Sequence, residues 1–254
     1  MNELEFSFEP DPVDAFLSGL KTGDRVAASR LLTLLEGEDT EALENVLQEL
    51  ETAGVTLEID LPKTHGTGEA AARLRQEELL AAEGLNPGLL EESDPLRLYL
   101  EELAGVPAFG DEAVLAAQCA EKAGGEEQLA NLGLSRVIEL AQDYVGYGVL
   151  LMDLIQEGSL GLWQAIQSYC EGVYADHRDR WIRFYLARAV ILQAHASGVG
   201  QKMRRAMEDY RQIDERLLAE LGRNPTLEEI AEQLHMSPEE TEAVKKNDRK
   251  RPPG

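Results

Sequence analysis

The sequence predicts an all-α protein built from tandem helical bundles. Apolar residues recur at spacings of three and four along most of the chain, which is the period of an amphipathic helix. The alternation typical of a half-buried strand occurs clearly only in VTLEIDL at 55–61. Several periodic segments also end in glycine, the residue that most easily adopts the left-handed conformation after a helix. These signals define the expected elements in order along the chain.

The first module, residues 1–61, is expected to form a small three-helix bundle. Its helical segments are 11–23, 26–37 and 40–54, and each of them closes with glycine. The module contains 15 acidic and 3 basic residues, so its surface is strongly negative. Two interpretations stay open: an acidic surface that mimics nucleic acid, and a solvated face that only keeps the protein soluble.

A linker and a second helical core are expected next. PKTHGTG at 62–68 has the composition of a linker, and a helix rich in Ala, Glu and Leu follows at 69–83. NPG at 86–88 then interrupts the helical pattern. From Asp94 helical segments resume as DPLRLYLEELAGVP and DEAVLAAQCAEKAGG, and a long apolar series runs from 129 to 166.

The stretch LMDLIQEGSLGLWQ at 151–164 predicts a helix with two different faces. Four apolar side chains can fill the core: Leu151, Leu154, Ile155 and Leu162. The other face is expected to carry Asp153, Gln156, Glu157 and Trp163, at offsets of three, four and ten. Gly158 and Gly161 would let another backbone approach closely. A tryptophan rimmed by polar groups is typical of an interface hot spot; the alternative is a core tryptophan beside solvated carboxylates.

The segment 178–205 reverses the charge of the chain. Against a net charge of −24 for the whole protein, it holds a single acid, Asp179, and seven basic residues: Arg178, Arg180, Arg183, Arg188, Lys202, Arg204 and Arg205. Clustered arginine and lysine favour a phosphate contact, and Trp181 and Tyr185 at four-residue spacing could stack bases. The alternative is that Trp181, Ile182 and Tyr185 pack into the bundle while the arginines pair with acids elsewhere. The residues alone leave both open.

The last helices are expected to form a helix, a tight turn and a second helix within 226–244. Thr226 with Glu229, and Ser237 with Glu240, match the capping box, in which a hydroxyl and a carboxylate satisfy free backbone N–H groups. Such a pair can read DNA as a helix-turn-helix. However, three glutamates in its second helix would repel phosphates, which favours a plain helical hairpin.

Several function classes find no support in the sequence. Cys119 and Cys170 lack metal-site spacing, no signal peptide opens the chain, and no apolar run reaches the roughly 20 residues of a membrane span. We therefore expect a soluble, cytoplasmic protein with reduced thiols. The four histidines are scattered, and no phosphate-binding glycine loop follows a strand. Accordingly we expect no enzyme activity, no cofactor, no metal and no small-molecule substrate.

MDLIQEGSLGL within the 151–164 stretch resembles the most recognisable motif of the bacterial RNA polymerase sigma factors of the primary, housekeeping family. DPLRLYLEELAGVP resembles the family's segment one-point-two, WIRFYLARAVILQ the end of region two, and LLAELGRNPTLEEIAEQLHMSPEETEAV region three. The acidic start resembles the autoinhibitory first region. The resemblance implies a region-one-like module at 1–61, a linker and helix at 62–93, a region-two-like domain at 94–195, and a region-three-like domain with a basic tail at 196–254.

The resemblance implies a transcription initiation protein, without catalysis of its own, that binds core RNA polymerase and directs it to promoter DNA. Its docking helix would bind a coiled coil of the polymerase's largest subunit through Asp153, Gln156, Glu157, Ser159 and Trp163. The DNA-binding residues that it implies are Arg178, Arg180, Trp181, Arg183, Arg188, Lys202 and Arg205.

The chain also departs from the family pattern. Arg180 replaces one of two paired tryptophans, and His177 stands where a stacking tyrosine is expected. Phe184 and Ala187 occupy the positions of a base-reading glutamine and threonine, and neither side chain can make a bidentate hydrogen bond to a base. The given sequence stops at RKRPPG without the family's fourth region, either because the chain was cut there or because the natural protein lacks that region. A second hypothesis follows: a divergent polymerase-binding regulator or competitor that no longer melts or reads a standard promoter.

Overall fold

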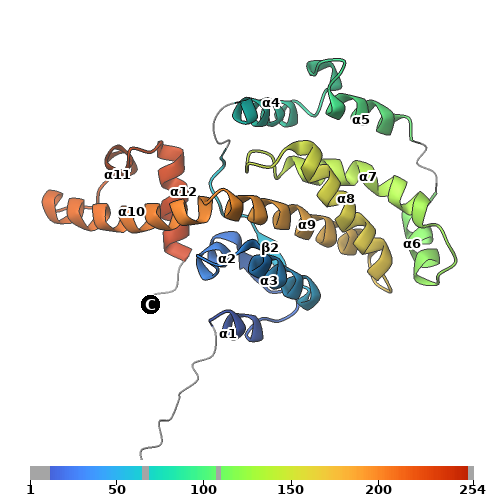
Figure 1. Ribbon diagram of the computed structural model, residues 1–254, viewed down its shortest axis with the longest axis horizontal. Coiled ribbons are helices and arrows are strands. Elements are labelled where there is room, and N and C mark those ends of the chain that lie inside the picture. Colours follow the sequence, from blue (N-terminus) through green and yellow to red (C-terminus); the bar gives the residue numbers. More distant parts are fainter. Residues whose placement is uncertain (1–11, 65–68, 107–109, 251–254) are drawn as a thin grey trace, which may run out of the picture.

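The computed structural model describes residues 12–64, 69–106 and 110–250. In these ranges the chain forms twelve α-helices, one short 3-10 helix and two three-residue strands, which confirms the predicted all-α class. The two longest helices follow one another along the long axis of the molecule, and the other helices pack around them (Figure 1).

The acidic N-terminal module contains three helices and a small parallel sheet. Its elements are α1 (Pro12–Ser18), β1 (Arg25–Ala27), α2 (Ala28–Leu34), α3 (Thr40–Ala53) and β2 (Thr56–Glu58). The second helix begins two residues later than the sequence suggested, because Val26 pairs with Leu57 across the strands and both side chains are buried. Asp39 caps α3, and Gly54 ends it with a positive φ of 69°.

A connecting region follows and leads into the central bundle. It consists of α4 (Glu69–Ala82), the 3-10 helix η1 (Pro87–Leu89), α5 (Pro95–Ala104) and α6 (Glu112–Ala120). Asp94 caps α5 and Asp111 caps α6, each by accepting hydrogen bonds from backbone N–H groups of the first turn. In Figure 1, α4 and α5 lie above the central helices.

The central bundle consists of α7 (Glu126–Gln142), α8 (Leu151–Ser168) and α9 (Tyr174–Ala196), with α8 packed against both neighbours. Its glycines explain the close packing. A Cβ on Gly158 would lie 2.7 Å from Val137 Cγ1, and a Cβ on Gly161 would lie 2.7 Å from the carbonyl oxygen of Trp181. Contacts this short do not occur, so glycine at these two positions lets α8 approach α7 and α9, as the sequence indicated.

The C-terminal helices are α10 (Val199–Leu221), α11 (Leu227–Leu234) and α12 (Pro238–Lys250). Both predicted capping boxes are present: Thr226 and Glu229 cap α11, and Ser237 and Glu240 cap α12. Buried side chains from all three helices form a small separate core: Tyr210, Ile230 and Val244.

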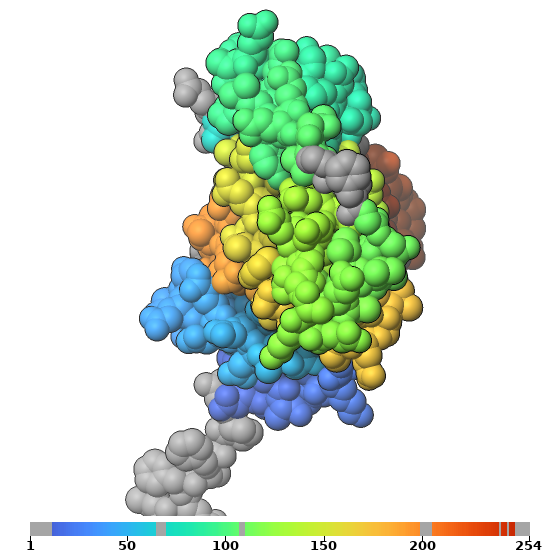
Figure 2. All heavy atoms as spheres, turned by 90° about the vertical axis from the view of Figure 1, so that its right-hand side faces the viewer, coloured from blue at the N-terminus to red at the C-terminus, as the bar shows by residue number. Residues whose placement is uncertain are grey.

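The acidic module lies directly on the central bundle and shares its main hydrophobic core. Elements α2, α3 and β2 pack against α9, and α2 also contacts α10. Figure 2 shows the blue acidic module against the yellow and orange helices of the bundle. The most negative part of the chain therefore covers part of its most positive helix.

Candidate functional site

Helix α8 presents a continuous exposed stripe. Five exposed side chains make up this docking stripe: Asp153, Gln156, Leu160, Trp163 and Gln167. Their separations of three, four, three and four residues are those of the seam of a coiled coil. Leu160 is 54% exposed and Trp163 50% exposed, so two large apolar groups lie open at the centre of a polar stripe. A surface of this shape can pack along another helix.

The docking stripe overlaps only partly with the predicted set. Asp153, Gln156 and Trp163 lie on it as expected. Glu157 instead turns towards α9, where its Oε2 lies 3.8 Å from Arg188 Nη1, and the Ser159 hydroxyl donates a hydrogen bond to the Ile155 carbonyl within α8. Leu160 and Gln167 were not predicted, although their spacing from the other stripe residues completes the heptad pattern.

The opposite side of α8 anchors the stripe. Leu151, Leu154, Ile155 and Leu162 are all buried, as predicted, in contact with the main core. Each buried leucine or isoleucine contributes roughly 2 kcal/mol of apolar burial. The stripe is therefore carried by a rigid helix and needs no folding step before it meets a partner.

A row of aromatic rings runs along α9 and the loop before it. Neighbouring ring centroids lie 5.2 to 6.5 Å apart along a series of six residues: Tyr169, Tyr174, His177, Trp181, Phe184 and Tyr185. The Trp181 indole N–H donates to His177 Nε2 at 3.1 Å. Burial, with a smaller contribution from Arg180, lowers the pKa of His177, so its imidazole is neutral and can accept this bond.

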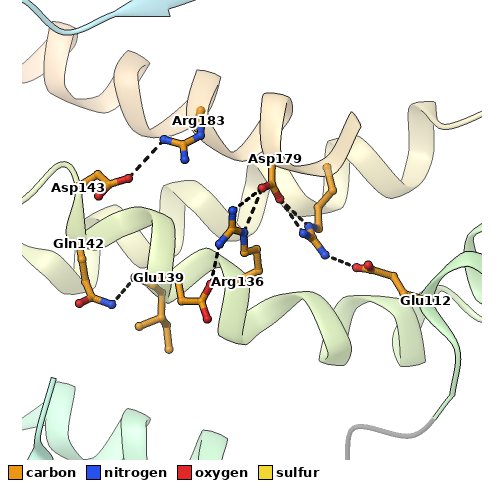
Figure 3. Close-up of polar contacts among 9 residues, drawn as sticks. Glu112, Arg136, Glu139, Gln142, Asp143, Asp179 and Arg183 are labelled. Atoms are coloured by element: carbon orange, nitrogen blue, oxygen red, sulfur yellow. Dashed lines mark hydrogen bonds and ion pairs between the residues drawn. The ribbon is translucent and has the colours of Figure 1, made fainter. Parts of the chain in front are cut away.

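An ion-pair network joins α9 to α6 and α7 (Figure 3). Arg178 is only 9% exposed and pairs with Glu112 and with Asp179. The other Asp179 oxygen accepts from Arg136 Nη2 at 2.6 Å, and Arg136 also pairs with Glu139 at 2.7 Å. Burial opposes the charge on Asp179, but the hydrogen bonds from Arg136 and Arg178 lower its pKa. This network holds the first turns of α9 in place.

The structure divides the predicted DNA-binding residues into two groups. Arg178 is enclosed in the network, Arg183 pairs with Asp143 at 3.4 Å, and Arg188 pairs with Glu157. Arg180 is exposed and lies 5.7 Å from the Trp181 ring centroid, and Arg205 is exposed on α10. The side chain of Lys202 lies outside the described residues. Some arginines of the basic segment therefore pair with acids of the chain, while others are exposed and available to contact phosphate.

The acidic module contacts α9 at its aromatic row. The Tyr185 hydroxyl donates to Glu51 Oε1 at 3.1 Å. Burial, together with the charge of Glu51, raises the pKa of Tyr185 to about 12, so the hydroxyl keeps its proton. Gly54 lies beside Arg180, whose Nη1 is 3.6 Å from the position of a Cβ at Gly54. The last turn of α3 thus contacts α9 at Tyr185, while Arg180 lies beside Gly54 and stays exposed.

The described parts of the chain offer neither a membrane span nor a metal site. No helix there is long and apolar enough to cross a membrane. Over the same residues, no three His, Cys, Asp or Glu side chains gather in a way that could hold a metal ion.

Comparison with protein families identifies two matching segments. Residues 130–173 match Sigma-70 region 2, and residues 205–250 match Sigma-70 region 3. The first match contains α8 with its docking stripe, and the second covers most of α10 together with α11 and α12.

Three curated relatives are RNA polymerase sigma factors named SigA. The protein from Bacillus sp. is 35% identical over 170 residues, which cover 64% of this chain and 44% of the relative. The one from Lactococcus lactis subsp. cremoris is 30% identical over 223 residues, or 81% and 59% of the two chains, and that from Listeria monocytogenes 28% over 214 residues, or 82% and 57%. The chain spans about half the length of these relatives. Both matched regions, in their proper order, and the SigA relatives show that the chain belongs to the sigma-70 family of RNA polymerase sigma factors.

Proposed function

We propose that this chain is a cytoplasmic transcription initiation protein without catalysis of its own, which binds core RNA polymerase through the docking stripe and directs it to promoter DNA through α9 and α10. The observation that carries the proposal is the stripe itself. It lies inside the residues that match Sigma-70 region 2, and it leaves two large apolar side chains in solvent. Exposed apolar groups on a rigid helix are costly unless a partner covers them.

The spacing of the stripe supports a coiled coil of the polymerase's largest subunit as the partner. Separations of three and four residues keep side chains aligned with a second helix over several turns. Leu160 and Trp163 supply an apolar centre, while Asp153, Gln156 and Gln167 supply a polar rim. Large apolar groups surrounded by polar ones are the usual arrangement of an interface hot spot.

Promoter contact is proposed for the solvent-facing members of the basic segment. Arg180 and Arg205 are exposed and can reach DNA without breaking an ion pair. The partly buried Trp181 lies beside Arg180, and Lys202 extends the same basic segment. Arg183 can exchange its carboxylate partner for a phosphate at small cost, because exposed ion pairs contribute only about 0–1 kcal/mol. The same exchange costs more at Arg188, because its pair with Glu157 is partly buried. Arg178 acts indirectly, by fixing the start of α9 through its network.

A specific observation favours the second function, a polymerase-binding regulator that reads no standard promoter. Phe184 is 4% exposed and Ala187 fully buried, so neither presents a group to a base edge. The acidic module also covers the same helix. Both features weaken promoter reading while leaving the docking stripe open.

One experiment separates these functions. The full chain would be used to capture purified bacterial core RNA polymerase, and the complex would be probed with permanganate on a consensus promoter. Capture with reactive thymines supports initiation. Capture without them supports the regulator, and no capture by the full chain would sink both. Leu160→Ala should reduce the capture, because it removes an apolar side chain from the centre of the stripe. Leu218→Ala is its matched control, because Leu218 is exposed on α10, away from the stripe.

A further inference from the structure

Helix α8 begins without a capping side chain of its own. Its N-cap residue is Leu150, whose side chain accepts no hydrogen bond. The first N–H of the helix, that of Leu151, donates instead to Glu77 Oε2 at 2.6 Å. Glu77 belongs to α4 and precedes Leu151 by 74 residues. A carboxylate in this position satisfies one of the free N–H groups of the helix start and interacts favourably with the helix dipole.

Glu77 is held rigidly in this position. It is 1% exposed, and its other oxygen accepts from Arg73 Nε at 2.9 Å. Arg73 also binds the Asp94 carboxylate through both terminal nitrogens, at 2.5 and 3.0 Å. Asp94 in turn caps α5 by accepting from the Leu96 N–H. A single buried network on α4 therefore fixes the starts of two helices, α5 and α8.

A second set of contacts ties the same region to the loop before α8. Lys63 pairs with Glu78 of α4 at 2.7 Å, and the Thr64 N–H donates to the Gly146 carbonyl at 2.8 Å. Burial raises the pKa of Glu77 while Arg73 and the Leu151 N–H oppose the rise. The Glu77 carboxylate is thus shielded from solvent, and it accepts hydrogen bonds from the Leu151 N–H and from the Arg73 guanidinium.

We infer that Glu77 is a positioning residue for polymerase binding, because it fixes the first turn of α8, which carries Asp153 of the docking stripe. The inference rests on the proposed function. According to this inference, α4 contributes to polymerase binding, although its residues lie outside both matched family regions. Asp153 lies two residues after the capped amide, whereas Trp163 lies more than two turns further along.

The test is a double-mutant cycle measured with the full chain and purified core polymerase. Glu77→Ala should weaken binding severalfold, because the first turn of α8 loses the carboxylate that accepts from the Leu151 N–H. The double variant Glu77→Ala with Asp153→Ala should lose less affinity than the product of the two single losses, because both residues act on the same turn of α8. In the double variant Glu77→Ala with Trp163→Ala, the two losses of affinity should multiply. Gln76→Ala is the matched control, since Gln76 is an exposed neighbour on α4.

Two further measurements separate positioning from general loss of stability. Amide hydrogen exchange in free Glu77→Ala should quicken at 151–154 and stay unchanged at 160–166. Glu77→Gln, which keeps one acceptor oxygen, should recover part of the affinity. Unchanged affinity in Glu77→Ala, or equal coupling to Asp153 and Trp163, would overturn the inference while leaving the proposed function intact. Failure of the unaltered chain to bind would overturn both.

Discussion

Helices α8 and α9 are packed side by side, yet their outward faces are in different states. The docking stripe on α8 is open to solvent, with Leu160 and Trp163 at its centre. On α9, by contrast, Arg178 is enclosed by carboxylates and Tyr185 is bonded to Glu51 of the acidic module. One face can meet a partner as it stands. The other must first exchange contacts that the chain makes with itself.

This difference determines what kind of change each face should tolerate. Under the proposed function, binding at α8 would depend on a few apolar groups, so single side chains there should affect affinity more than stability. On α9 the charged residues already have partners within the fold. Substitutions there should divide into those that unfold the protein and those that alter DNA binding, according to which partner each residue has.

The largest expected effect is on the open face. Gln156→Ala combined with Trp163→Ala should weaken binding of core polymerase by about 3 kcal/mol, because a half-exposed tryptophan with a polar neighbour is a typical hot-spot pair. The unfolding temperature should change less than for a core substitution, since Gln156 is exposed and about half of the Trp163 side chain lies in solvent. Titration calorimetry measures the affinity, and Leu218→Ala is the control. Equal affinity for the variant and the unaltered chain would remove the docking assignment.

The next effect is on stability and comes from α9. Asp179→Ala leaves the enclosed Arg178 guanidinium with fewer acceptors and should lower the free energy of unfolding by about 2 kcal/mol, less than a fully buried pair because Asp179 is partly exposed. Asp143→Ala breaks the exposed pair with Arg183 and should cost less than about 0.5 kcal/mol. Urea denaturation compares the two. Similar losses in the free energy of unfolding would show that burial does not make the Arg178–Asp179 pair more stabilising than the Arg183–Asp143 pair.

The same network predicts the direction of a pH dependence. The pKa of Asp179 is lowered in the folded chain from its ordinary value near 3.8. Its contribution to stability is therefore fully present above that value and is lost as the pH falls through the lower folded pKa. In acid titrations monitored by circular dichroism, Asp179→Ala should lack this part of the loss, while Asp143→Ala should keep it.

A third effect distinguishes two arginines on the same helix. Arg180→Gln should reduce the slope of log affinity against log salt for duplex DNA by roughly 0.9, the value for one lost phosphate contact. Arg178→Gln should leave the slope unchanged and lower stability instead, because its guanidinium is enclosed. Adding Arg183→Gln and Arg188→Gln to the first variant should flatten the slope further. A slope that is unaffected by Arg180→Gln would show that this side chain does not touch phosphate.

Most of the fold could be predicted because its signals are local. The two capping boxes, the glycine after α3 and the apolar side of α8 depend on residues a few positions apart. Strand β1 could not be predicted in this way. Val26 pairs with Leu57, which lies beyond two helices, and three residues are too few to show an alternating pattern. The sequence analysis therefore extended the second helix over residues that form a strand.

The candidate site divides along the same line. Three of the five stripe residues were predicted because helical spacing alone places them together, and Leu160 could have been found by the same rule. The enclosure of Arg178 could not, because its partner Glu112 lies 66 residues away and net charge does not tell which acid meets which base. The hydrogen bond from the Leu151 N–H to Glu77 could not be predicted either, since nothing near Leu151 in the sequence indicates it.

The smallest expected effect concerns the hydrogen bond between Tyr185 and Glu51. It tests whether this bond weakens DNA binding by α9 in addition to the negative charge of the module. Glu51→Ala and Glu49→Ala each remove one negative charge from α3, but only Glu51 accepts the hydrogen bond from Tyr185. If that bond contributes the usual ~1 kcal/mol or less, Glu51→Ala should raise the affinity of the free chain for single-stranded promoter DNA by about two- to threefold more than Glu49→Ala does. Fluorescence anisotropy at fixed salt measures both. Equal gains would mean that the hydrogen bond to Tyr185 adds nothing to the effect of the module's charge on DNA binding by α9.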